Sequence, residues 1–576
     1  MAITKERTAV KDSRADTHKS HALWYLLGWI LAALIAMIKI HLTNPPIADD
    51  AFITLRYSFN LIHHGSFTYN FPTPQLTSAE TSPLYGLLLA PVLYFFNPVT
   101  SFNIVMVASV ASGALLLYEL IRREWGVFAG YLAALIFLLN DYLYATRGME
   151  TSLFIFASLG TILLLHSVTH DLLTIDRKAR LAKALGAGIL LATTVFIRGE
   201  GVLLLLFPPI ELVLGMGRNY RTAKREDQLR LQNPHALIEP NPRPIRTTFE
   251  TPGKPLKTLL AFILGTLIVT APMATLLQLE TGSFIPGTLL AKQAQARSGF
   301  WGKGWLYYTN MVNFIKTNPW RNEIYDLAIF AGLGLIIILF SKTHWRNRPL
   351  TLTIIAFALL QLIAYGNILI VPFYHWYMGP QIVAVSALSA IALSVILAKF
   401  RRSLAAKAAT IPALILFAFF IYSSTTLIGQ TGIPWDQASY MEAAGWLQEN
   451  TPANATVASS EIGYLGYYSQ RQMVDYVGLL SKQAANWVGQ GNLFYWIYYY
   501  KPDYWIVHNP PWSLEEATKL PWFQTTYSPV AYFKGIVIYK RVAPVPPLPE
   551  NQQIFAQLSE VPWKTPLAAT TDSPLP

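Results

Sequence analysis

Two adjacent aspartates, Asp49 and Asp50, are the residues whose type and position most clearly suit chemistry. They begin the segment ADDAFITLRYSFNLIHHG, in which apolar residues recur at helical spacing over 51–64. That pattern predicts a short amphipathic helix lying along a bilayer, with both carboxylates at its N-terminus, where the helix dipole keeps an acid ionised. An ionised carboxylate can act as a general base. The alternative interpretation is a helix N-cap with a solvated neighbour.

Further polar residues recur at the ends of the apolar segments that follow. They are Glu80 in SAETSP, Arg147 and Glu150 in RGMETS, Arg198 and Glu200 in RGEG, Lys292 in PGTLLAKQ, and His375 in YHWYMGP. A single cluster of this kind is typical of a helix cap with its partner. Several clusters at one face of a membrane indicate a common cavity.

Membrane helices are the elements that must position these residues. Of the 576 residues, 53% are hydrophobic and 13% are charged, which is about half the charge density of a soluble chain. This composition excludes a disordered, collagen-like or disulfide-stapled chain, and the absence of cysteine excludes thiol catalysis and zinc-thiolate sites. The net charge of +12 does not indicate nucleic-acid binding, because membrane proteins carry surplus Lys and Arg in their cytoplasmic loops.

Apolar runs long enough to cross a bilayer, about 17 to 25 residues, occur eleven times. They lie at 22–42, 101–121, 127–144, 151–168, 180–197, 201–217, 258–278, 324–341, 350–371, 376–398 and 408–428. The segment 83–96 is shorter and contains two prolines, which suits a helix lying in the interface. The sequence therefore predicts a polytopic α-helical membrane protein with about eleven transmembrane helices. Lys39, late in the first helix, is the clear mid-span charge, and we expect it to extend outward to the interface.

The distribution of basic residues predicts how these helices are oriented in the membrane. When 83–96 is not counted as a span, the loops assigned to the cytoplasm contain 27 Lys or Arg, and the outer loops before residue 430 contain 8. By the positive-inside rule, the N-terminus (1–21) and the basic, proline-rich loop 218–257 are cytoplasmic, whereas the loop 43–100 is extracytoplasmic. The chain is accordingly expected to be a multi-pass protein of the plasma (inner) membrane.

The residues after the membrane module (22–428) resemble a small extracytoplasmic α/β domain over 430–541. Hydrophobic periodicity predicts a helix at 436–449 and strands at 455–460, 503–508 and 535–541, with turn and strand signals through 461–480. Glu461, Asp475 and His508 lie near the predicted strand ends, and we assign them surface or turn roles. The proline-rich stretch 542–576 lacks periodicity and is expected to be disordered.

The motifs, taken together, resemble those of one known superfamily. ADDAFITLRY, AETSPLYGLLL, RGMET, IRGEG and PGTLLAK occur in an order and spacing similar to the GT-C superfamily of polyprenyl-phosphate-sugar-dependent glycosyltransferases, nearest to the terminal arabinofuranosyltransferase-like branch. WLQENTPANATVASSEIGYLGYYSQ resembles the extracytoplasmic domain that ends many of these chains. The resemblance covers about residues 22 to 541. This chain has Glu80-Thr81-Ser82-Pro83 and Arg198-Gly199-Glu200 where the family often has Glu-Gly-Tyr-Thr and Arg-Pro-Glu.

The resemblance implies a GT-C-like fold and a reaction. A hexosyl or pentosyl group would pass, with inversion, from a polyprenyl-phosphate-linked donor to a cell-envelope glycan, lipid or protein on the extracytoplasmic face. An acid of the first outer loop would be the base, with Asp49 our first choice and Asp50 our second. Neither a nucleotide-binding fingerprint nor any certain cofactor is present in the sequence, and a divalent cation is an option that the sequence leaves open.

The resemblance also suggests roles for the remaining polar residues. The leaving phosphate needs cations, for which the candidates are Lys292, Arg147, Arg198 and His375, with the first two favoured. The acids that would orient sugar hydroxyls or hold a metal ion are Glu80, Glu150 and Glu200. The aromatic residues that would contact the acceptor are Tyr374, Trp376, Tyr377 and Trp496. The outer domain would bind the acceptor or shield the site.

Two other classes of function compete with a transferase. A transporter or flippase of a lipid-linked sugar would require ionisable residues near the bilayer midplane, where Lys39 is the clear candidate. A noncatalytic membrane subunit that binds an envelope glycan through its outer domain is the other alternative. The donor sugar, the acceptor and the polyprenyl length stay open.

The topology can be tested with reporter fusions. A reporter fused after residue 430 should give an extracytoplasmic signal, and one inserted in 218–257 a cytoplasmic signal, because the basic loops stay inside. Alkaline phosphatase and green fluorescent protein activities of the two fusions measure this. A cytoplasmic signal after residue 430 would place every proposed site residue on the wrong side.

Overall fold

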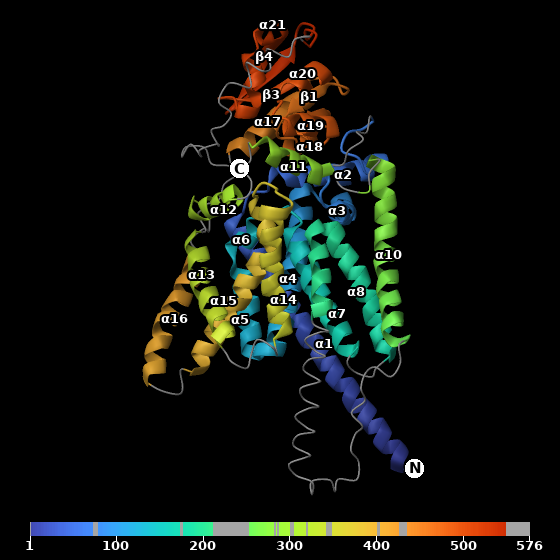
Figure 1. Ribbon diagram of the computed structural model, residues 1–576, viewed down its shortest axis with the longest axis vertical. Helices are drawn as coiled ribbons and strands as arrows, with labels where there is room; N and C mark the ends of the chain where they lie inside the picture. The colour runs from blue at the N-terminus through green and yellow to red at the C-terminus, as the bar shows by residue number, and fades with distance from the viewer. Residues whose placement is uncertain are drawn as a thin grey trace.

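A computed structural model of the protein describes residues 2–72, 79–172, 177–210, 253–281, 284, 287–299, 305–317, 321–340, 348–399, 404–424 and 435–548. The chain forms a bundle of long helices with an α/β domain on one end (Figure 1). We call this end of the bundle the domain face. Most of the predicted cytoplasmic loop 218–257 and residues 549–576 of the predicted tail lie outside the described residues.

The bundle confirms a polytopic helical membrane protein. Seven described helical segments are long and apolar enough to cross a membrane: Ala22–Thr43 in α1 (Ala2–Thr43), α4 (Pro98–Trp125), Thr151–Thr169 in α7 (Thr151–Leu172), Arg180–Ile197 in α8 (Arg177–Ile197), Leu256–Leu279 in α10 (Gly253–Thr281), Pro349–Ile368 in α14 (Pro349–Ile363) with η4 (Ala364–Ile368), and His375–Lys399 in η5 (His375–Met378) with α15 (Gly379–Lys399). All seven coincide with predicted spans.

The other four predicted spans correspond to shorter apolar helices. Their described apolar parts are α5 (Val127–Leu139), Gly199–Ile210, which begins with η1 (Gly199–Leu206), Ile324–Phe340 in α13 (Arg321–Phe340), and Leu414–Ser423 in α16 (Leu404–Ser423). The predicted span 201–217 is described only as far as residue 210. The predicted interfacial helix 83–96 is α3 (Pro83–Phe95).

A buried ion pair shortens the predicted span 127–144. The helix α5 ends at Leu139, Asn140 is extended, and Asp141 begins the short helix α6 (Asp141–Tyr144). Asp141 Oδ1 lies 2.6 Å from Lys39 Nζ, and the two side chains are 2% and 9% exposed. Lys39 also donates a hydrogen bond to the carbonyl of Ser424, just beyond α16. The expectation that Lys39 extends outward is therefore wrong, because its charge is matched inside the bundle.

The C-terminal domain is a five-stranded mixed sheet in the order β2-β1-β3-β5-β4. Its strands are β1 (Thr456–Ser459), β2 (Gln472–Asp475), β3 (Tyr504–His508), β4 (Tyr527–Phe533) and β5 (Ile536–Arg541). β1 pairs in parallel with β2 and β3, and β5 pairs antiparallel with β3 and β4. Its helices are α17 (Trp435–Asn450), α18 (Gly463–Ser469), α19 (Lys482–Gly489), α20 (Tyr495–Tyr500), η6 (Ser513–Lys519) and α21 (Phe523–Thr526).

Most expected elements of this domain are present, but the sequence analysis missed β4. The predicted helix 436–449 and the strands at 455–460, 503–508 and 535–541 correspond to α17, β1, β3 and β5. β4 lies at the edge of the sheet, contains Pro529, and has mostly half-buried or exposed side chains. An edge strand tolerates proline and lacks a strong apolar pattern, so its sequence signal is weak.

The domain sits on the helix that carries the aspartate pair. That helix, α2 (Asp49–His64), packs against α18, and α11 (Gly287–Ser298) packs against α19. Ala51, Phe52 and Leu55 share one hydrophobic core with Ile462 and Leu465 of the domain. Burial of a large apolar side chain stabilises a structure by about 1.5–3 kcal/mol. The domain and the membrane module are thus joined by a continuous core. Figure 1 shows α18 and α19 next to α2 and α11 at the domain face.

The Lys39–Asp141 pair gives a stability prediction. Lys39→Met removes the ammonium that compensates the buried Asp141 carboxylate, so we expect a loss of about 3–5 kcal/mol. The double variant Lys39→Met/Asp141→Leu should recover much of this loss. Thermal unfolding in detergent, followed by tryptophan fluorescence, measures both.

The control for this prediction is Arg123→Ala. Arg123 pairs with Glu119 one helical turn away, and its side chain is 42% exposed. Loss of such a pair should cost about 0.5 kcal/mol or less. Equal destabilisation by Lys39→Met and Arg123→Ala would contradict a structural role for the buried pair.

Candidate functional site

Asp49 binds the C-terminal domain. The N-cap of α2 is Ala48, and no side chain caps this helix. The two carboxylate oxygens of Asp49 instead accept hydrogen bonds from the backbone amides of Gly463 (2.7 Å) and Tyr464 (2.8 Å), at the start of α18. Burial raises the pKa of Asp49 to about 7, although the amides oppose this rise, and the nearby charge of Asp50 adds to it. Asp49 therefore caps a helix of the domain.

Asp50 lies on the same helix and faces different neighbours. It is half-buried, and within the described residues its carboxylate has no hydrogen-bond or ion-pair partner. Its charge acts on Glu80 and Glu150 and also on Lys292. Asp50 is thus the member of the pair whose carboxylate is not engaged by another described residue.

Lys292 is the cation that complements Asp50. It projects from α11, and its ammonium lies 4.0 Å from the centre of the Tyr374 ring, a cation–π distance. In the described part of the chain no carboxylate lies within 4.0 Å of this ammonium. Lys292 can therefore bind an anion without breaking an existing ion pair.

Arg198 is fully engaged inside the protein. Its side chain is 2% exposed, and its Nε lies 2.8 Å from Glu200 and 3.5 Å from Glu150. Its Nη1 donates to the carbonyl of Trp376 at 2.7 Å, and the guanidinium lies 4.9 Å from the centre of the Tyr377 ring. These three charged residues form a buried cluster that supports the site.

Tyr365 completes this cluster, and the sequence analysis missed it. Its hydroxyl donates to Glu200 Oε2 at 2.6 Å. Tyr365 lies in η4, a π-helical turn at the end of α14. Such turns are frequent at functional sites, but they leave no clear signal in the sequence.

Arg147 holds the chain between α1 and α2. The guanidinium donates to the side-chain oxygens of Asn103 (2.9 Å) and Asn44 (3.0 Å) and to the carbonyl of Pro45 (2.8 Å). Arg147 is 5% exposed. Because its partners fix the segment that leads into Asp49, its structural role is to position α2.

His375 packs among aromatic residues. Its ring is parallel to Phe314, with the ring centres 5.1 Å apart, and its carbonyl accepts a hydrogen bond from the Tyr142 hydroxyl at 2.9 Å. Nε2 lies 3.4 Å from the carbonyl of Ala145. These contacts place His375 in the wall of the helix bundle.

Glu80 is a buried acid in the segment between α2 and α3. It is 1% exposed, and Oε1 accepts a hydrogen bond from the backbone amide of Ser82 at 2.7 Å. Burial raises the pKa of Glu80 to about 8, with smaller contributions from the negative charges of Glu150 and Asp50. At neutral pH this carboxyl is mostly protonated and can donate a hydrogen bond.

The predicted aromatic contacts divide into two groups. Tyr374 is stacked on Trp376, with ring centres 4.8 Å apart, and Tyr377 lies beneath Arg198. These three residues form a platform for the two cations. Trp496 is 1% exposed and stacks on Tyr476 in the core of the C-terminal domain. The expected acceptor contact for Trp496 does not agree with this position, and we do not retain it.

Glu461, to which the sequence analysis gave a surface or turn role, lies next to Asp49. It follows β1 directly, its side chain hydrogen-bonds Asp49, and its charge acts on Tyr374. The carboxyl ends of β1 and β3 form the point where the chain turns to opposite sides of the sheet, and ligand-binding residues gather at such points. That position is the signal that could have identified Glu461.

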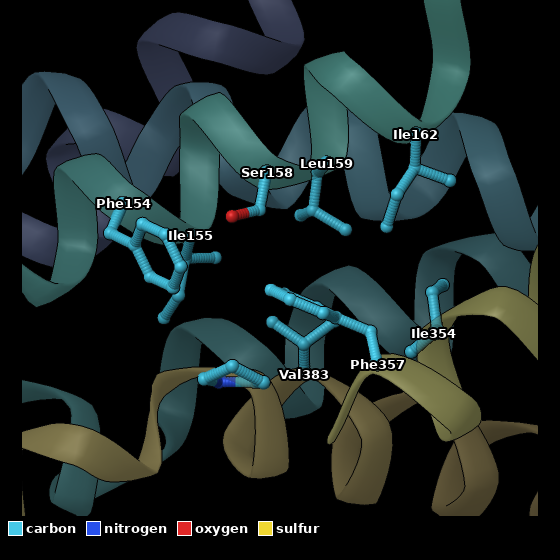
Figure 2. Close-up of a pocket in the computed structure, with 9 residues that line it drawn as sticks. Phe154, Ile155, Ser158, Leu159, Ile162, Ile354, Phe357 and Val383 are labelled. Carbon is cyan, nitrogen blue, oxygen red and sulfur yellow. The ribbon is translucent and has the colours of Figure 1, made fainter. Parts of the chain in front are cut away.

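A small apolar pocket lies in the bundle beside Phe154, whose ring centre is 5.7 Å from the Arg198 guanidinium. Figure 2 shows that Phe154, Ser158 and Ile162 of α7 line it opposite Phe357 of α14 and Val383 of α15. Its free space is about 10 Å³, close to that of one water molecule. It is too small for a substrate.

In the described residues no group of three or more His, Asp or Glu is placed to hold a metal ion.

We compared the sequence and the structure of this chain with those of known proteins. A family model described as a domain of unknown function (DUF8728) matches residues 431–554. A comparison with curated protein sequences gives no match. Among solved structures, the chain is similar to ArnT from Cupriavidus metallidurans bound to undecaprenyl phosphate, with a TM-score of 0.55 and 15% identity over 92% of this chain and 99% of ArnT.

Two further structures show the same similarity. ArnT in the apo state gives a TM-score of 0.54 at 15% identity, covering 91% of this chain and 99% of ArnT. The Archaeoglobus fulgidus oligosaccharyltransferase tethered with an acceptor peptide containing the NVT sequon gives 0.52 at 14% identity, covering 90% of this chain and 74% of that protein. The fold is therefore GT-C-like, as predicted.

The protonation of Glu80 can be measured directly. We expect its protonated carboxyl to be present below pH 8 and to be lost above it, because burial disfavours the ionised form. In infrared difference spectra of wild type minus Glu80→Gln, the carbonyl stretch of a protonated acid should titrate with a midpoint near 8. The matched control is Asp503→Asn, whose difference spectrum should lack this band at neutral pH, because hydrogen bonds from Thr456 and Arg541 outweigh its partial burial and lower the pKa of Asp503. A Glu80 midpoint near 4 would contradict the buried environment.

Proposed function

We propose that the chain is an integral-membrane glycosyltransferase that uses a polyprenyl-phosphate-linked sugar and transfers it to a cell-envelope acceptor on the extracytoplasmic face of the plasma membrane. The observation that carries this proposal is the pair Asp50 and Lys292. One is a carboxylate and the other an ammonium, both lack ion-pair partners among the described residues, and both lie at the domain face of a GT-C-like bundle.

The two groups suit the two ends of an inverting sugar transfer. Asp50 accepts the proton of the acceptor hydroxyl while that oxygen attacks the anomeric carbon. The bond between the anomeric carbon and the phosphate oxygen breaks on the opposite side. The electron pair leaves with the polyprenyl phosphate, whose growing negative charge is stabilised by Lys292. The products are the glycosylated acceptor and a polyprenyl phosphate monoester.

Asp50 replaces Asp49 as the favoured base. Both oxygens of Asp49 already accept backbone amides of α18, so removing a substrate proton would compete with two hydrogen bonds. Asp50 is free of such bonds in the described structure and lies near Lys292. The sequence does not separate the two, because the partners that distinguish Asp49 come from a segment more than four hundred residues away.

The remaining candidates have supporting roles in this proposal. Arg198 with Glu150 and Glu200 forms a fixed cluster, and Arg147 and His375 hold the backbone around it. A protonated Glu80 donates a hydrogen bond to a sugar hydroxyl. Tyr374, on its platform with Trp376 and Tyr377, faces the substrates, where an aromatic ring can stack on a sugar face.

The lipid donor has support from a neighbour in fold. The similar ArnT structure contains undecaprenyl phosphate, and an anion of this kind suits Lys292. The arabinofuranosyltransferase-like branch remains our hypothesis for the sugar, with other pentoses and hexoses as alternatives. A transporter is less favoured, because Lys39, the mid-span charge that motivated it, is paired with Asp141.

Substitution of the two groups tests the proposal. Asp50→Asn should lower kcat by about 10²–10⁴-fold because the general base is lost. Lys292→Gln should lower it by about 10²–10³-fold because phosphate charge is no longer stabilised. Sugar transfer is measured in proteoliposomes with a panel of radiolabelled polyprenyl-phosphoryl pentoses and hexoses and a cell-envelope extract as acceptor.

The control is Lys316→Gln in α12 (Trp305–Thr317), which likewise removes one lysine charge. Lys316 is exposed, so kcat should stay within about twofold of wild type. Full transfer by Asp50→Asn would refute the assignment of the base. Movement of the labelled lipid across the bilayer by the wild type, without product, would support a flippase instead.

A further inference from the structure

We infer that the C-terminal domain sets the distance between Asp50 and Lys292, and that Asp49 is the positioning residue that fastens the domain to the site. This inference rests on the proposed function for its effect on rate. The docking of the C-terminal domain on α2 and α11 can be measured separately, in an assay that does not depend on sugar transfer. Three sets of contacts support it.

The first contact is the carboxylate of Asp49 at the start of α18. This helix follows β1 at the carboxyl edge of the parallel strands, where α/β domains commonly bind anions on backbone amides. Here the bound anion belongs to the chain itself, since Asp49 occupies the amides of Gly463 and Tyr464. The domain therefore docks on α2 through the edge that usually holds a ligand.

The second set of contacts depends on two glycines of α18. A Cβ added at Gly463 would lie 1.8 Å from the backbone oxygen of Asp49, and one added at Gly466 would lie 1.9 Å from the Tyr69 hydroxyl. Both distances are shorter than any real contact, so larger residues would push α18 away from α2. The absence of side chains at these positions allows the backbones to meet.

Hydrogen bonds follow the same line of contact. Arg56 of α2 donates to the carbonyls of Gly466 and Arg471, each at 2.6 Å. Asn70 exchanges two hydrogen bonds with the backbone of Met473 in β2, at 2.9 and 3.0 Å. The helix that carries Asp50 is thus attached to the domain along its length and through the loop after it.

The third contact holds the helix that carries Lys292. α11 packs against α19, where a Cβ added at Gly489 would lie 3.3 Å from the Cβ of Ala294. Ala291 and Ala294 flank Lys292 and are buried. α2 meets the domain through α18, and α11 meets it through α19, so the same domain contacts the helix that carries the carboxylate and the helix that carries the ammonium.

Loosening the domain should then lower the rate while the reacting groups stay intact. Catalytic groups must be held to within about 0.5 Å, and a displacement of about 1 Å can cost about 10²-fold in rate. We expect Asp49→Asn, whose side chain has one acceptor oxygen in place of two, to lower kcat by about 10–100-fold. The KM for the donor should change by less than about threefold, since Lys292 is retained.

A disulfide rescue separates positioning from proton transfer. The chain has no cysteine, so Ala294→Cys with Gly489→Cys introduces a single pair. The separation of 3.3 Å between a Cβ at position 489 and the Cβ of Ala294 is close to the about 3.5–4.5 Å found in disulfides. In the Asp49→Asn background, formation of the disulfide should restore kcat to within about threefold of the kcat of the disulfide-bonded protein that retains Asp49. Reduction of the disulfide should lower kcat again. If Asp49 were the base, the disulfide would restore nothing, and the inference would be overturned.

The rate of disulfide formation reports docking independently of catalysis. In the full-length protein, the bond should form about tenfold more slowly with Gly463→Ala than with the matched Gly445→Ala, because a Cβ at Gly445 meets no atom within 4 Å. Asp50→Asn should leave the formation rate unchanged. Equal rates for the two glycine variants would refute the docking mechanism. Normal docking in a protein that transfers no sugar would instead refute the proposed function.

Discussion

Burial of charge in the helix bundle is the constraint on which the rest of the structure depends. An ionised group taken out of water costs several kcal/mol unless partners compensate it. The compensated groups at the domain face are Lys39 with Asp141, Arg198 with Glu150 and Glu200, and Arg147 with Asn44, Pro45 and Asn103. Asp50 and Lys292 differ from these groups, because neither has an ion-pair partner among the residues that the structure describes. Charged groups without compensation concentrate at functional sites.

The aspartate pair shows how helix geometry assigns different roles to identical neighbours. Successive residues of an α-helix point about 100° apart, so two adjacent acids at the start of α2 cannot face the same partner. Asp49 faces the amides of α18, whereas Asp50 is directed toward the charges of the bundle. The first carboxylate gains hydrogen bonds that fix the helix, and this fixation determines where the second carboxylate lies.

The helix bundle was predictable from the sequence because a long apolar run is directly typical of a helix surrounded by lipid. Polar residues at span ends indicated a candidate site by the same argument, because a charge close to the apolar interior of a membrane requires a reason. Contacts between distant segments were not predictable: nothing near Asp49 indicates Gly463, and nothing near Lys39 indicates Asp141.

The prediction for Trp496 was wrong because aromatic residues serve equally well in a core and on a sugar-binding surface. The strand β4 was missed because edge strands carry a weak pattern.

A substrate at the boundary between lipid and water poses a positioning problem that a helix bundle alone does not solve. An amphipathic helix on the bilayer surface is held by burial of its apolar face, which is not directional and leaves sliding and rotation inexpensive. Hydrogen bonds are directional, and α2 obtains them from a domain outside the bundle through Asp49, Arg56 and Asn70. Because the same domain also packs against α11, we infer that the spacing of Asp50 and Lys292 depends on this domain as well as on the membrane helices.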